Sequence, residues 1–172
     1  RPVYRGARVL GSAFTVQIQS MDIAAISRAY ELAKPQDVLV VAADGDSRFA
    51  CAGEISTFKS IRLGIAGLVV DGSVTDIREM EAMKFPCFAR HITPLVGRRI
   101  GEKGSVRKPV TVGGVLVHPG DLVFADDNGV VFLDPAEAAV IIGELLEKEG
   151  KEAELRESFW RERGMAVPVI YS

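Results

Sequence analysis

The chain has 172 residues, 48% of them hydrophobic, which is enough for one domain to bury a core without disulfides or structural metals. Its 21 basic and 23 acidic residues nearly cancel, so a nucleic-acid partner is not indicated. With two cysteines and apolar runs no longer than a strand, neither a disulfide framework nor a membrane partner is expected. We expect one soluble, cytoplasmic domain and, because the chain begins at Arg1 rather than Met, a segment that precedes it.

The first half of the chain alternates the patterns of strands and helices. The strand patterns are alternating or continuously apolar, and the continuous ones are typical of strands buried on both faces. The helix patterns repeat apolar residues every three to four positions, and Asp22 is a candidate cap for the first helix. In chain order we expect a strand at 7–18, a helix at 22–32, a strand at 38–42, a helix at 53–63, a strand at 66–70 and a helix at 76–83. This order predicts a parallel sheet.

Beyond Pro86 the pattern changes to short strands separated by Gly, Pro and Asp turns. This half is predicted to be β-rich and barrel-like. Pro135 then begins a long amphipathic helix that continues to about Trp160. The short strands are expected at 87–90, 109–112, 115–117, 122–125 and 130–133. The predicted fold class is α/β, with a parallel-sheet half, a β-rich half and a C-terminal helix, in a single domain over 1–172 with its helical extension from about residue 135.

The first candidate site is the acidic loop 44–48, which leads from a buried strand toward the helix that begins at Gly53 and Glu54. Ligands of open α/β sheets bind at the carboxyl ends of strands, and the N–H groups of a helix N-terminus attract anions. The amides of Ile55 and Ser56 are therefore candidates for holding a small carboxylate or phosphate. Glu54 could instead do no more than interact with the helix dipole. A dinucleotide or methyltransferase site is not indicated, because the further glycines that it needs are missing.

The second candidate site is the turn 70–76, which again leads from a strand into a helix. Two equivalent turns at the same edge of a parallel sheet would bring Glu54, Asp71 and Asp76 toward one crevice. Carboxylates that converge with water suit Mg²⁺ or Mn²⁺. The alternative is that Asp76 only caps the helix, together with Glu79 three residues later.

The order of these motifs along nearly the whole chain resembles the RraA-like family. The runs that carry the resemblance are Gly53-Glu54, then 66–76, 85–90, 109–114 and 119–131. That family includes class II aldolases that cleave 4-hydroxy-4-methyl-2-oxoglutarate or 4-carboxy-4-hydroxy-2-oxoadipate and also decarboxylate oxaloacetate. The resemblance implies a swivelling β/β/α domain, a small 2-oxo acid as substrate, and a homotrimer or hexamer with sites between subunits.

Active members of the family carry an acidic residue, twenty intervening positions and then Arg-Asp. The same count here, 75 − 54 = 21, places Glu54 at the acidic position, Thr75 where Arg is expected and Asp76 at the metal-binding Asp. The resemblance implies that Mg²⁺ or Mn²⁺ binds at Asp76, and that the amides after the acidic residue, those of Ile55 and Ser56, bind the pyruvate carboxylate. Gly53, Glu54 and Thr75 are the further residues expected to contact the substrate.

The resemblance leaves three points open. A glutamate from a neighbouring subunit's C-terminal helix is expected to join the site through water, and Glu152 is its match. Since Thr75 cannot supply the family's positive charge, Arg78 or Arg48 could replace it, or the substrate could differ or catalysis be lost. The family's namesake inhibits an endoribonuclease and lacks the metal Asp, so a non-catalytic binding role is the alternative, as is a domain that only binds a metabolite. The presence of Asp76 favours the enzyme.

Overall fold

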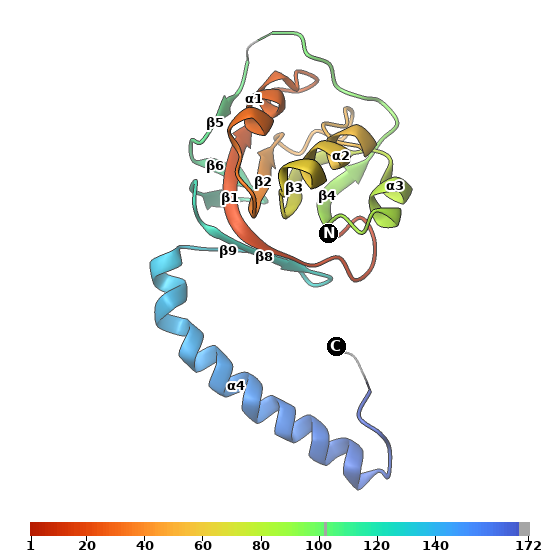
Figure 1. Ribbon diagram of the computed structural model, residues 1–172, viewed down its shortest axis with the longest axis vertical. Coiled ribbons are helices and arrows are strands. Elements are labelled where there is room, and N and C mark those ends of the chain that lie inside the picture. Colours follow the sequence, from red (N-terminus) through yellow and green to blue (C-terminus); the bar gives the residue numbers. More distant parts are fainter. Residues whose placement is uncertain (102, 169–172) are drawn as a thin grey trace. The chain divides into compact units, whose positions relative to one another are not determined.

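The computed structural model describes residues 1–101 and 103–168 and divides the chain into two units, 1–134 and 135–172. All the described strands and three of the described helices lie in the first unit (Figure 1). The strands are β1 (Val9–Gln17), β2 (Asp37–Ala42), β3 (Gly67–Val74), β4 (Cys87–Ile92), β5 (Ser105–Val106), β6 (Val110–Val112), β7 (Val115–Val117), β8 (Leu122–Asp126) and β9 (Gly129–Leu133). The helices are α1 (Ala24–Leu32), α2 (Glu54–Leu63) and α3 (Ile77–Ala82), followed in the second unit by α4 (Pro135–Glu162).

One mixed sheet organises the first unit. Its strand order is β4-β3-β2-β1-β8-β9, and β5 also pairs with β1. Strands β1 to β4 are parallel and are joined by α1, α2 and α3, as expected for consecutive βαβ units. The predicted α/β class with its parallel sheet is therefore confirmed.

The strands predicted for the β-rich second half of the chain lie partly in this sheet and partly in a separate hairpin. β4 extends the parallel sheet at one edge, because it follows the last crossover helix α3. β8 and β9 extend the sheet antiparallel beyond β1, and only β6 and β7 form a hairpin of their own. The two-residue strand β5 was not predicted from the sequence.

The sheet is covered on both faces, which gives three layers. Alternate residues of β2 point to opposite sides: Leu39 and Val41 pack in one cluster with residues of α1 and α3, whereas Val38 and Val40 pack with the β6–β7 hairpin. Fully burying one such aliphatic side chain stabilises a fold by roughly 1.5–3 kcal/mol. The resulting hairpin, sheet and helix layers correspond to the β/β/α arrangement that the resemblance implied.

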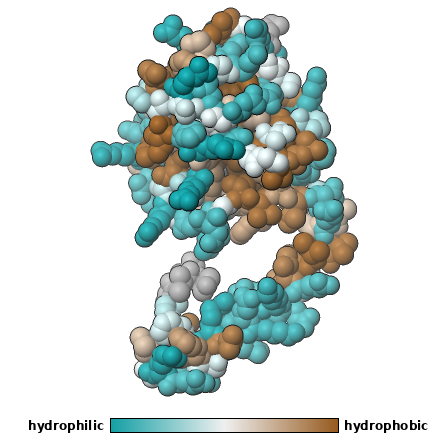
Figure 2. Space-filling view, turned by 180° about the vertical axis from the view of Figure 1, so that it is seen from behind, coloured by the Kyte–Doolittle hydropathy of each residue, from teal (hydrophilic) through white to brown (hydrophobic). Residues whose placement is uncertain are grey.

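Helix α4 has 28 residues, and none of its described residues is buried. Val140 and Leu155 expose 79% and 69% of their surface. Figure 2 shows a polar stretch in the middle of this helix with apolar side chains toward both ends. Ion pairs one turn apart, such as Lys151 Nζ to Glu147 Oε1 at 2.6 Å, support the polar stretch. None of the helices that the structure describes is both long and apolar enough to cross a membrane.

Candidate functional site

A cavity of about 320 Å³ opens where α1, the first turn of α2 and the turn after β3 meet. Its lining is largely apolar and includes Ile23 and Ile26 of the α1 segment. It lies beyond the carboxyl ends of parallel strands, where open α/β sheets bind their ligands. The polar and charged residues of its wall include Glu54, Ser56, Lys59, Thr75, Asp76 and Arg99.

Asp76 is held in a fixed position at this cavity. Its backbone is left-handed, with φ 55° and ψ 42°, a conformation that Asp tolerates better than most residues. Its Oδ2 accepts a hydrogen bond of 2.9 Å from the N–H of Glu54, and its Oδ1 accepts one of 3.2 Å from the Thr75 hydroxyl. Glu54 and Asp76 thus lie side by side at the cavity, joined through the backbone N–H of Glu54, and the role of their carboxylates stays a prediction.

Gly53 allows this close approach. A Cβ atom at position 53 would lie 2.5 Å from Asp76 Oδ2 and 2.7 Å from Thr75 Cγ2. The backbone of Gly53 is extended, so the requirement for glycine comes from space and not from conformation. Its N–H donates to Ser56 Oγ at 3.1 Å. The structure therefore gives Gly53 a packing role, and its predicted contact with substrate stays a prediction.

The first turn of α2 presents N–H groups to the cavity wall. Those of Ile55 and Ser56 have no partner inside the helix, because they belong to its first turn. Such groups, together with the helix dipole, favour a bound anion. Tyr30 of α1 supports this turn: its hydroxyl donates to Ser56 O at 3.1 Å and lies 3.1 Å from Ser60 Oγ. Burial raises the pKa of Tyr30 to about 12.

Asp71 does not join the site, and the expectation that three carboxylates converge is wrong in this respect. Strand β3 continues to Val74, so Asp71 lies within the strand and not in the turn. Its buried carboxylate pairs with Arg90 Nε and accepts a 3.0 Å hydrogen bond from the N–H of Gly113. It lines none of the cavity that Asp76 borders.

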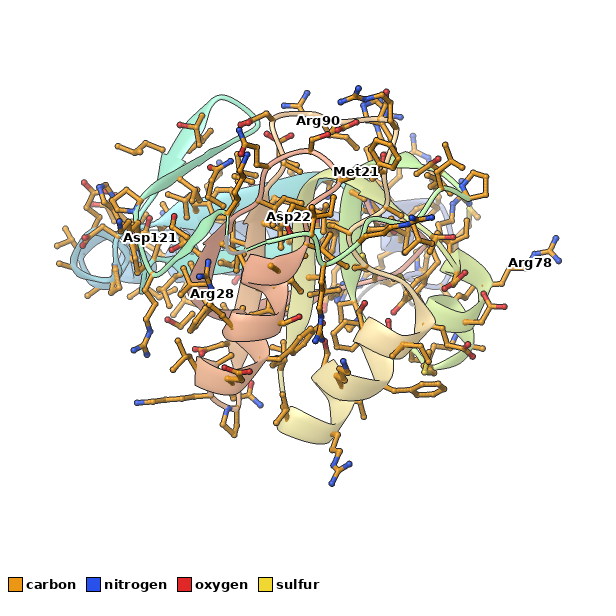
Figure 3. The ribbon with its side chains drawn as sticks, turned by 90° about the horizontal axis from the view of Figure 1, so that it is seen from above. Met21, Asp22, Arg28, Arg78, Arg90 and Asp121 are labelled. Atoms are coloured by element: carbon orange, nitrogen blue, oxygen red, sulfur yellow. The ribbon has the colours of Figure 1, made fainter. Side chains whose placement is uncertain are left out.

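The two arginines proposed to replace the family's guanidinium also lie elsewhere. Arg78 projects away from the unit (Figure 3) and does not line the cavity. Arg48 pairs with Asp46 at 3.0 Å and borders a different hollow. The cations that do line the cavity are Lys59 and Arg99. Neither residue was predicted from the sequence, where the only signal for Arg99 is its position next to Arg98.

The residues present fit a hydrated metal ion better than a metal held in a protein cage. No group of three or more His, Cys, Asp or Glu side chains that could hold a metal occurs among the described residues. Mg²⁺ usually keeps several waters and takes one or two carboxylates, and Asp76 with Glu54 nearby offers that number. Glu152 lies on α4, 3.8 Å from Lys148 Nζ, and its role beside a neighbouring subunit stays a prediction.

Comparison with known proteins gives a family match and several similar proteins. Residues 1–132 match the RraA-like family, described as Aldolase/RraA. A protein of Halalkalibacterium halodurans, provisionally named 4-hydroxy-4-methyl-2-oxoglutarate aldolase, is 35% identical over 167 residues, which cover 97% of this chain and 79% of that protein. Streptomyces coelicolor RraAS2, described as an unusual member of the RNase ES inhibitor RraA family, matches with a TM-score of 0.80 and 31% identity over 91% of this chain and 81% of its own. The RNA-processing inhibitor RraA from Thermus thermophilis matches with a TM-score of 0.71 and 31% identity over 77% and 80%.

Proposed function

Because this chain belongs to the RraA-like family, we propose that it is a metal-dependent class II aldolase and decarboxylase of pyruvate-type 2-oxo acids. Its reactions would be cleavage of 4-hydroxy-4-methyl-2-oxoglutarate or 4-carboxy-4-hydroxy-2-oxoadipate, and decarboxylation of oxaloacetate. The observation that carries the proposal is the carboxylate of Asp76, which is fixed at the cavity wall beside the first turn of α2.

Each part of this wall has a role in the proposal. Asp76 would hold Mg²⁺ or Mn²⁺, with Glu54 as a second negative charge nearby. The N–H groups of Ile55 and Ser56 would bind and orient the carboxylate next to the keto group. A divalent cation bound there would polarise the keto oxygen and stabilise the negative charge that develops as the C–C bond breaks. Aldol cleavage and decarboxylation both leave the enolate of pyruvate, so one site can serve both.

We also propose that the chain assembles into a homotrimer or hexamer. Helix α4 exposes apolar side chains, including Val140 and Leu155, and buries none of its described residues. Apolar surface of this extent commonly marks an interface. In such an assembly Glu152 would reach a neighbouring subunit's site. Light scattering of the purified protein is expected to report three copies or a multiple of three, and a monomer would remove Glu152 from the site.

A pyruvate-release assay tests the function. Oxaloacetate and a panel of 4-hydroxy-2-oxo acids are incubated with the protein in Mg²⁺, in Mn²⁺ and in a chelator, and the rate without protein is subtracted. Pyruvate formation that needs the protein and the metal is the expected result. Calorimetry with Mn²⁺ then compares Asp76→Ala with Asp44→Ala, which removes an exposed carboxylate that does not line the cavity. Equal Mn²⁺ binding by the parent and Asp76→Ala would show that the metal is not held there.

The second candidate function is that of a non-catalytic regulator of an endoribonuclease. Two of the solved relatives are described as inhibitors of RNA processing or of an RNase, and this supports it. The purified chain would then slow RNA cleavage by such an enzyme, and would release no pyruvate from any acid in the panel.

A further inference from the structure

The position that carries a guanidinium in active family members is neutral in this chain. Thr75 lines the cavity, and its hydroxyl is already engaged with Asp76 Oδ1 at 3.2 Å. The positive charge of the cavity therefore comes from other segments, from Lys59 on α2 and from Arg99 on the chain that follows β4.

The charges around the cavity indicate what it would accept. Glu54 and Asp76 provide two negative charges, and Lys59 and Arg99 provide two positive charges. A divalent cation at Asp76 would leave the lining with an excess of two positive charges. A ligand with two carboxylates would neutralise that excess, whereas a ligand with one carboxylate would leave half of it.

Arg99 is better suited than Lys59 to recognise a carboxylate. In the part of the chain that the structure describes, Arg99 forms no ion pair, and its side chain is exposed at the cavity wall. A guanidinium offers two parallel donors that match the two oxygens of a carboxylate, whereas an ammonium acts as a point charge on a flexible stem.

The backbone on both sides of Arg99 is anchored to the segment before α1. The N–H of Arg98 donates to Met21 O at 2.7 Å, and the Arg98 carbonyl accepts from Ile23 N at 3.0 Å. Gly97 packs against the same segment, since a Cβ there would lie 2.7 Å from Ile23 Cγ2. These contacts fix the approach of the chain to the cavity.

Asp22 completes this anchor. Its buried carboxylate accepts hydrogen bonds from the N–H groups of Ala24 at 3.0 Å, Ile100 at 3.3 Å and Gly101 at 3.1 Å. The bond from Ala24, followed by those from Ile100 and Gly101, lowers the pKa of Asp22. Figure 3 shows Asp22 at the beginning of α1, next to Met21. One carboxylate thus ties the residues after Arg99 to the first residue of α1, a helix that lines the cavity.

We propose that Arg99 binds the second carboxylate of a dianionic 2-oxo acid, in place of the guanidinium absent at position 75, and that Asp22 is its positioning residue. This inference rests on the proposed function. The amides of Ile55 and Ser56 take the carboxylate beside the keto group, and Arg99 takes the distal one. Arg99 is then the residue that makes the site prefer 2-oxo diacids to pyruvate.

Calorimetry in saturating Mn²⁺ tests this with two stable acids, 2-oxoglutarate with two carboxylates and pyruvate with one. Arg99→Gln is expected to weaken 2-oxoglutarate binding about tenfold, as for one charge-assisted hydrogen-bonded pair, and pyruvate binding less than twofold. Arg99→Lys should fall between the parent and Arg99→Gln. Arg98→Gln is the matched control, because it removes the neighbouring arginine, which does not line the cavity, and it should change neither affinity.

Asp22→Asn tests the positioning role. An amide keeps one acceptor oxygen, so Asp22→Asn should weaken 2-oxoglutarate binding by only about threefold and should change pyruvate binding little. In a protein that already carries Arg99→Gln, Asp22→Asn should not weaken 2-oxoglutarate binding further. Equal weakening of both acids, or the same loss with and without Arg99, would show that Asp22 has only a structural role. Thermal unfolding of each variant identifies any loss of fold.

The outcomes separate this inference from the proposed function. If the parent decarboxylates oxaloacetate but Arg99→Gln keeps the same KM and the same affinity for 2-oxoglutarate, Arg99 is not the binding residue and the function stands. If the parent has no lyase activity but needs Arg99 to bind 2-oxoglutarate, the inference stands and the function does not. A parent that binds neither acid overturns the inference.

Discussion

Asp71 lies within β3 and Asp76 lies just beyond its end, and the two carboxylates have opposite kinds of environment. Asp71 is buried within β3, paired with Arg90 and bonded to the N–H of Gly113. Asp76 is exposed in the turn beyond β3 and borders the cavity. The difference arises because β3 extends to Val74. Successive side chains of a strand point to opposite faces of the sheet, which fixes the direction of Asp71, whereas Asp76 lies outside the strand and is not subject to this constraint. A carboxylate's position relative to the strand end decides whether it stabilises the fold or can meet a ligand.

The largest effect that this comparison predicts is on activity. Asp76→Ala should lower metal-dependent decarboxylation of oxaloacetate by about a hundredfold or more, because the cation that stabilises the developing charge loses its ligand. Its unfolding free energy in urea should fall by only about 1 kcal/mol, the usual worth of a polar group at a helix start. A variant that loses several kcal/mol instead would mean that Asp76 is structural, as Asp71 is.

The opposite balance is expected at Asp71. Asp71→Ala leaves Arg90 and the N–H of Gly113 without their partner, and should lower the unfolding free energy by about 2 kcal/mol. This is less than for a fully buried ion pair, because the Arg90 side chain is 48% exposed. Urea unfolding gives the stability, and the specific activity of the folded protein should stay within threefold of the parent. Asp44→Ala, at an exposed loop, is the control for removing a negative charge.

Thr75 provides an intermediate test on the cavity side. In an Arg99→Gln background, Thr75→Arg should raise decarboxylation of oxaloacetate about tenfold, which corresponds to about 1.4 kcal/mol of transition-state stabilisation. In the parent the gain should be smaller, because Arg99 already supplies a positive charge. Steady-state rates of the four proteins give the comparison. An equal gain in both backgrounds would show that the two positions act independently.

The smallest effect concerns the support beneath the cavity. Tyr30→Phe removes the hydroxyl that donates to Ser56 O and should lower the unfolding free energy by about 1 kcal/mol at pH 7. The folded-state pKa of Tyr30 is raised to about 12 from its ordinary 10.0. Its contribution to stability is therefore complete below pH 10 and is lost as the pH rises toward 12. Urea unfolding from pH 9 to pH 11.5 should show a shallower decline for Tyr30→Phe than for the parent, and parallel curves would contradict this.

Local patterns predicted the strand and helix order well, because each depends on residues close in the chain. The alternation of β1, the apolar run of β2 and the amphipathic repeat of α4 are all visible in the sequence. The same holds for Glu54 and Asp76, since each follows a recognisable strand-to-helix transition and the spacing between them matches the family. The two-residue strand β5 carries too short a pattern to be predicted.

The composition of the cavity was decided by tertiary structure. No local pattern shows that β3 runs on past Asp71, that Arg78 turns outward, or that Tyr30 supports the first turn of α2, because each depends on how the elements pack against one another. Arg99 reaches the wall only because backbone bonds to Met21 and Ile23, together with the carboxylate of Asp22, hold its segment against α1. Those contacts join parts of the chain that lie far apart in the sequence, so the sequence by itself determined the acidic half of the site and the packing of the fold determined the basic half.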